Sequence, residues 1–167
     1  YSFSGDNEIT GTIRFHEGGT ARDLTVPSFG TAEAAGPTGK GCAIEWGLKG
    51  CRLVYVGPGD TLTQPLVLTK DGCLANEGSG TFRVESAISG TGGLSLQGGA
   101  FAIATDVPNA LLPKPGVVTA FSLRPGETSA RRSVGKLTLP SGRSTVVVED
   151  GVTVDVGACS ADGAVLN

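Results

Sequence analysis

Four carboxylates recur at nearly constant spacing in the second half of the chain. Glu85, Asp106, Glu127 and Glu149 follow one another at intervals of about 21 residues, a period typical of repeated structural units. If the chain coils with that period, the four side chains would lie near one edge of successive coils, where stacked carboxylate oxygens can bind Ca²⁺. Acidic residues at turns are more often simply solvated. We therefore expect these four to face solvent, with no metal bound.

A polysaccharide lyase built on such carboxylates would also need a basic proton abstractor on the same face. Arg83 and Arg124 are candidates by position alone, and the single histidine, His16, stands beside Glu17 at an expected turn. No G-x-S-x-G nucleophile motif occurs. The glycine clusters at 90–93 and 97–99 precede no predicted helix, which a phosphate-binding loop requires. The sequence predicts no enzyme activity, no catalytic residue and no cofactor.

The cysteines offer a different chemistry, disulfide formation. Cys42 and Cys51 enclose a short segment that includes two glycines, which predicts a local disulfide. Cys51 and Cys73, separated by about one repeat, form the second-best pair. Cys73 and Cys159 would stand about four coils or ~19 Å apart, whereas a disulfide needs Cα atoms within about 7 Å. These two would be buried thiols or would link one molecule to another.

The composition indicates where the protein is located and argues against several classes of protein. Four cysteines in a chain rich in Gly, Thr and Ser favour an extracellular or cell-surface location. The net charge is −3 and the sequence contains no cluster of basic residues, which argues against nucleic-acid binding. No apolar run approaches the ~18 residues of a membrane span. At 167 residues the chain is expected to form a single domain, 1–167.

The elements that must position these residues are short β-strands. Residues 59–105 consist of brief apolar runs separated by Gly, Ser, Asn, Asp and Thr, which leaves no room for a helix. Two tracks of apolar anchors repeat there and beyond, each with a period of about 20 residues. The first contains Leu62, Phe82, Phe101 and Phe121, and the second contains Leu53, Leu74 and Leu94. The repeat predicts stacked coils of ~20 residues, with the three phenylalanines in one inward column.

Two segments depart from the repeat. Residues 1–29 contain two expected strands, 8–15 and 23–29, which could cap the domain or exchange with another chain. Residues 106–116 hold three prolines, which lack the N–H that a central strand donates. We expect 106–116 to be an inserted loop.

The segment Ile88-Ser89-Gly90-Thr91-Gly92-Gly93-Leu94, within residues 59–105, resembles the strand repeat of bacterial autotransporter passenger domains and related secreted right-handed β-helix proteins. The resemblance covers 59–105 well and 117–157 loosely. It implies a β-helix, a surface location and an adhesive or scaffolding role, and it transfers no catalytic residue.

The sequence thus predicts an all-β protein, a right-handed parallel β-helix or related β-solenoid. Its expected function is that of an extracellular structural, adhesive or filament-forming module, with self-association or a host or matrix surface as partner. A two-sheet β-sandwich of the pilin or adhesin type is the alternative fold. A carbohydrate-active β-helix enzyme acting on polysaccharide is the alternative function.

Overall fold

The computed structural model describes residues 1–16, 23–140 and 144–161. Within these residues the chain forms sixteen β-strands and no helix. The strands form three sheets, and neighbouring strands within each sheet are parallel. The all-β prediction is confirmed.

The bounds of the strands follow the three sheets. The four-stranded sheet, which we call sheet B, contains β1 (Thr12–Phe15), β3 (Ala43–Trp46), β6 (Leu66–Leu68) and β9 (Ile88–Gly90). The seven-stranded sheet A contains β2 (Asp23–Val26), β4 (Arg52–Tyr55), β7 (Gly72–Asn76), β10 (Leu94–Gly98), β12 (Val107–Pro113), β14 (Ala130–Leu139) and β16 (Val152–Ala161). The five-stranded sheet C contains β5 (Asp60–Leu62), β8 (Phe82–Val84), β11 (Ala100–Ile103), β13 (Val118–Phe121) and β15 (Thr145–Val148).

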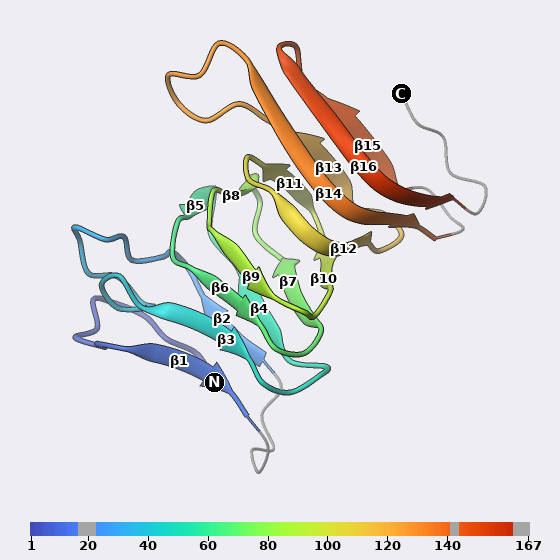
Figure 1. The fold of residues 1–167 in the computed structure, drawn as a ribbon. Coiled ribbons are helices and arrows are strands. Elements are labelled where there is room, and N and C mark those ends of the chain that lie inside the picture. Colours follow the sequence, from blue (N-terminus) through green and yellow to red (C-terminus); the bar gives the residue numbers. More distant parts are fainter. Residues whose placement is uncertain (17–22, 141–143, 162–167) are drawn as a thin grey trace.

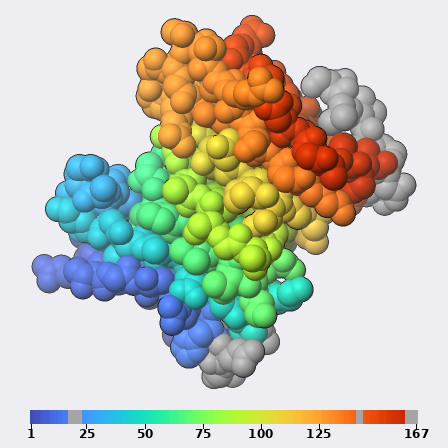
Figure 2. Space-filling view, viewed as in Figure 1, coloured from blue at the N-terminus to red at the C-terminus, as the bar shows by residue number. Residues whose placement is uncertain are grey.

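Between residues 52 and 98 the chain visits the three sheets in turn, which is the winding of a β-solenoid. Before this segment the strands alternate between sheets B and A, and after it they alternate between sheets A and C. From β4 in sheet A the chain passes to β5 in sheet C, to β6 in sheet B and back to sheet A with β7. Short polar turns join these strands, so each circuit brings a strand beside its equivalent one coil earlier (Figure 1). The N-terminal and C-terminal parts therefore lie at opposite ends of the molecule (Figure 2). The alternative β-sandwich is wrong, because its sheets would be built from antiparallel pairs.

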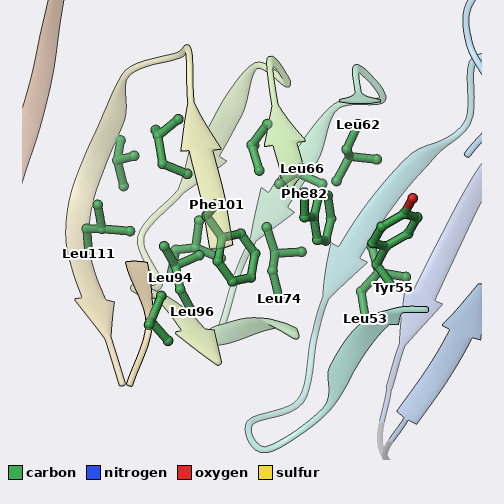
Figure 3. Close-up of a cluster of buried hydrophobic side chains, with 14 of the residues drawn as sticks. Leu53, Tyr55, Leu62, Leu66, Leu74, Phe82, Leu94, Leu96, Phe101 and Leu111 are labelled. Atoms are coloured by element: carbon green, nitrogen blue, oxygen red, sulfur yellow. The ribbon is translucent and has the colours of Figure 1, made fainter. Parts of the chain in front are cut away.

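The core fills the space between the three sheets. Because strand side chains alternate, the strands direct alternate apolar residues inward, and these stack on their equivalents in the next coil. Figure 3 shows Leu53, Leu74 and Phe82 directed into this interior from different strands. Phe82 and Phe101 are paired across β8 and β11, with ring centroids 5.3 Å apart.

The exact columns differ from the prediction. Phe121 is buried, but it lies opposite Ile103, while Phe101 faces Thr119. The expected single column of three phenylalanines is therefore wrong for Phe121. In the second track Leu74 lies opposite Leu53 and Leu96, and Leu94 belongs to the neighbouring column. Both errors shift the register by two positions, which keeps the side chain facing inward.

The expected inserted loop at 106–116 is also wrong. Residues 107–113 form β12, which pairs with β10 on one side and β14 on the other. The sheet accommodates the prolines because the register shifts between Val107 and Ala110, around Pro108, and because Pro113 is the last residue of the strand.

The N-terminal segment forms the first coil. Within the predicted strands 8–15 and 23–29, the structure has β1 and β2, which pair with β3 and β4 of the same chain. Residues 1–3 add a short bridge to β2 through Ser2 and Thr25. In the described residues this segment is thus part of the solenoid.

Glycines allow the corners of successive coils to approach closely. A Cβ added to Gly80 would lie 1.7 Å from the carbonyl oxygen of Pro58, and one added to Gly78 would lie 2.1 Å from that of Gly57. Any larger residue at these corners would collide with the backbone of the preceding coil. The coil spacing of this part of the molecule therefore depends on glycine.

Candidate functional site

Most of the candidate functional residues lie at or near the corner that follows sheet C. Glu85, Ala104, Ser122 and Glu149 each come directly after a sheet C strand, and the N–H of each donates to the preceding coil. Glu85 and Glu149 therefore occupy one column, three coils or about 14 Å apart. Two carboxylates at that separation cannot share a metal ion or a substrate atom.

Asp106 and Glu127 do not join this column. The Asp106 carboxylate accepts a hydrogen bond from the N–H of Ser133, at 2.7 Å. Glu127 lies in the turn before β14 and accepts from the N–H of Arg124 at 2.7 Å and from the Arg132 guanidinium. These bonds hold the pKa of Glu127 below its usual value. The expected edge of four stacked carboxylates is wrong, because Asp106 and Glu127 lie beyond the corner.

Arginines cap the carbonyl oxygens at this corner. Arg124 donates from Nε to the oxygen of Ala104, at 2.8 Å, and from Nη2 to that of Glu85, at 3.3 Å. Arg83 donates to the Glu85 carboxylate at 2.6 Å and to the oxygen of Leu123. Both predicted candidates for a proton abstractor are guanidinium groups engaged as hydrogen-bond donors, a role that stabilises the corner.

Arg132 belongs to the same network, although the sequence did not single it out for a role. Its side chain points inward from β14, is 7% exposed and donates to the oxygen of Ser122 at 3.3 Å. Its Nε has no hydrogen-bond partner among the described residues. Arg131, its neighbour, points outward and pairs with Asp155. Successive side chains on a strand point to opposite faces, so one of these two adjacent arginines had to face the interior. The sequence alone could have shown this.

A shallow depression of about 530 Å³ lies on the outer side of sheet C beside the corner. Its charged residues are Asp60, Arg83 and Glu149. The Asp60 carboxylate accepts from the N–H of Phe29 and of Thr61, and Glu149 accepts from the Ser122 hydroxyl at 2.7 Å. Each charged group thus has a partner within the protein. No cluster of three His, Cys, Asp or Glu residues suited to a metal ion occurs in the described part of the chain.

The cysteines are all free, so the predicted disulfide between Cys42 and Cys51 is wrong. Strand β3 runs between the two residues, and its extended backbone alone spans about 13 Å, beyond the ~7 Å of a disulfide. The Cys42 thiol donates instead to the oxygen of Ile9, at 2.8 Å. The second-best pair, Cys51 and Cys73, is not bonded either.

Cys73 and Cys159 lie in sheet A on β7 and β16, four strands apart as the sequence predicts. Cys73 is buried, and burial raises the pKa of its thiol, whereas Cys159 is exposed. The remaining candidate, His16, lies exposed immediately after β1, and its neighbour Glu17 is outside the described residues.

Ion pairs link adjacent coils across the outer faces. Arg14 on β1 pairs with Glu45 on β3 at 2.8 Å, and Arg52 on β4 donates from Nε to Asp23 on β2 at 2.9 Å. The hydrogen bonds from Arg52 lower the pKa of Asp23, because they favour its charged form. Pairs of this kind align neighbouring strands in addition to the backbone ladder.

The Asp23–Arg52 pair predicts a pH dependence of stability. The pKa of Asp23 is lower in the folded chain than in the unfolded one, where it is about 3.9. Its contribution is therefore present above about pH 4 and is lost as the pH falls through the folded pKa. We expect Asp23→Asn to lower the free energy of unfolding by up to about 1 kcal/mol at pH 7, since the pair is partly exposed. Urea denaturation of both proteins from pH 7 to pH 2 measures this, and a gap that stays constant to pH 2 would contradict it.

Comparisons of the chain with protein-family models, curated proteins and solved structures found no match. None of the described residues forms a helix long and apolar enough to cross a membrane. The class that the fold defines is an all-β solenoid with parallel sheets.

Proposed function

We propose that this protein is an extracellular structural or adhesive surface module without catalytic activity. The observation that carries the proposal is that the charged residues at and near the corner that follows sheet C, Asp60, Arg83, Glu85, Glu127 and Glu149, all bind partners within the protein. A hydrolase or lyase needs an acid and a base that converge on one substrate atom. The corner instead joins successive coils to one another.

The shape of the molecule supports the same role. A solenoid offers long, regular side faces, and such surfaces suit extended contact with another surface. We place the chain with the right-handed β-helices that it resembles in sequence, since crossovers between parallel strands are right-handed in about 98% of cases. A secreted surface protein of this kind would meet a host or matrix surface as its partner.

The competing function is a carbohydrate-active enzyme that uses the depression at Arg83 and Glu149. We expect no release of product from a panel of acidic and neutral polysaccharides, with or without added Ca²⁺, because the charged groups of the depression are already bonded. We also expect no change in melting temperature when a chelator is added. A bound Ca²⁺ ion would stabilise the folded state, so its removal would lower the melting temperature.

The experiment combines a reducing-sugar assay with thermal unfolding and with binding to plates coated with matrix proteins and glycans. Binding of the protein to the coated plates, without release of reducing sugar, supports the proposal. Turnover that Arg83→Lys abolishes would establish the enzyme instead. A melting temperature that a chelator lowers and Ca²⁺ restores would establish bound Ca²⁺ and favour the enzyme. Arg14→Lys, on another face of the solenoid, is the matched control.

A further inference from the structure

A depression of about 320 Å³ lies on the outer face of sheet A, in the middle of the sheet. It spans β7, β10 and β12, which are neighbouring strands from successive coils. Its apolar part includes Ala110 and Leu112, which face outward from β12. Its polar side chains are those of Asp71, Ser95 and Lys114. Because all of these residues lie on or directly beside strands of one sheet, the backbone ladder fixes their relative positions.

A tight glycine corner forms one wall of the depression. The N–H of Gly93 donates to the Asp71 carboxylate, and its oxygen accepts from the N–H of Gly72, each at 2.9 Å. A Cβ added to Gly93 would lie 3.2 Å from the Cβ of Ala110, so glycine at this position leaves the hollow open. The bonded backbone keeps this wall in place without a ligand. A site that is formed in advance loses little free energy to ordering when a ligand binds.

Two of the polar groups in the depression are hydrogen-bond acceptors. The Ser95 hydroxyl donates to the oxygen of Gly72 at 3.1 Å, so its proton is used and its lone pairs remain. The N–H of Gly93 and the Lys49 ammonium group lower the pKa of the Asp71 carboxyl group, which keeps it ionised. The ion pair with Lys49 is exposed, and a carboxylate has more lone pairs than these two bonds occupy. Both groups therefore suit a ligand that brings hydroxyl donors.

The third polar group is a cation without a counter-charge. Lys114 is exposed, and its ammonium group has no ion-pair or hydrogen-bond partner among the described residues. By contrast, Arg52 on the same face of sheet A pairs with both Asp23 and Glu77. A carboxylate that approached Lys114 would gain a charge-assisted hydrogen bond, the stronger kind. Lys114 is therefore the group in the depression that selects an anionic ligand over a neutral one.

We propose that this depression binds a carboxylated sugar unit of an acidic glycan. The carboxylate pairs with Lys114, and the ring hydroxyls donate to Ser95 and Asp71. The C–H face of the sugar ring covers Ala110 and Leu112. The volume lies at the lower end of the range of small-molecule sites, which suits a sugar unit. The inference rests on the proposed adhesive role and names the class of ligand.

Titration of the isotope-labelled full chain with glucuronic acid, followed by NMR, tests the site. We expect the amide signals of Gly93, Ser95 and Lys114 to shift and to saturate. Glucose, which lacks the carboxylate, should bind about tenfold more weakly because it cannot pair with Lys114. Acetate should also bind about tenfold more weakly, because it brings no hydroxyl donor to Ser95 or Asp71. Glucose or acetate that binds as tightly as glucuronic acid, or the absence of saturable shifts with glucuronic acid, would overturn the proposal.

Two variants separate the site from a general attraction of anions. Lys114→Gln should weaken the binding of glucuronic acid about tenfold and leave that of glucose unchanged. Lys40→Gln is the matched control, because it removes the same charge from an exposed lysine in the loop before β3. Equal losses of glucuronic acid binding in the two variants would refute the site.

Plates coated with a polyuronate extend the test to a whole glycan. We expect Lys114→Gln to lose binding to these plates and Lys40→Gln to retain it. A chain that binds plates coated with matrix proteins but shows no shift with glucuronic acid refutes this site and leaves the adhesive role standing. Release of reducing sugar from the polyuronate, with the amide shifts at Gly93 and Ser95 still present, refutes the role without catalysis and leaves the site standing.

Discussion

Replacing Phe82 by alanine is expected to lower the free energy of unfolding by about 3–5 kcal/mol. The Phe82 side chain is fully buried, and its ring centroid lies 5.0 Å from that of Phe29, 5.2 Å from that of Tyr55 and 5.3 Å from that of Phe101. Truncation removes the apolar area of the ring and three aromatic contacts. It also leaves a cavity between rigid strands that cannot collapse to fill it.

Equilibrium denaturation in urea measures the loss. Val118→Ala is the control, because Val118 lies on the adjacent part of the same sheet and is 43% exposed. Its loss should stay below about 1 kcal/mol. If Phe82→Ala and Val118→Ala cost the same, the aromatic cluster would not be the centre of the core.

Replacing Gly80 by alanine is expected to be comparably severe, with a loss of about 3 kcal/mol or more. The added methyl group would lie 1.7 Å from the carbonyl oxygen of Pro58 and 2.3 Å from its carbonyl carbon. Both atoms belong to the backbone of the preceding coil, so relief requires the two coils to separate. Separation would break the hydrogen bonds that join neighbouring strands at this corner.

Gly50→Asn provides the contrast for Gly80→Ala. Gly50 has a φ of +80°, and no heavy atom lies within 4 Å of an added Cβ. Asparagine tolerates this left-handed conformation better than most residues, so we expect a loss below about 1 kcal/mol. Thermal unfolding of both variants separates the two effects, and a small loss for Gly80→Ala would show that this corner is not close-packed.

The sequence predicted the solenoid but not its columns, and strand geometry explains the difference. Phe101 and Ile103 are two positions apart on β11, so both face inward. The repeat period shows that strands recur, yet it cannot decide which of two inward residues lies opposite Phe121. Turn lengths decide that, and they vary from coil to coil.

The candidate site was harder to predict because regular spacing does not fix position around a coil. Asp106 follows Glu85 by about one repeat, but the turns between them place it beyond the corner, where it bonds to Ser133. The disulfide prediction failed for a related reason. The residues between Cys42 and Cys51 include an extended strand, so closeness along the chain became distance in space.

The pairing of each strand with its equivalent one coil away limits how a chain of this design can change its length. Leu66 lies opposite both Ile44 and Ile88, so loss of the whole coil from position 66 to position 87 would bring Ile88 against Ile44 with the ladder restored. Loss of a few residues within a strand would instead shift the register of all that follows in that coil. Duplication or deletion of gene segments that encode whole coils is therefore tolerated in such a protein. The length of the solenoid then changes by whole coils during evolution.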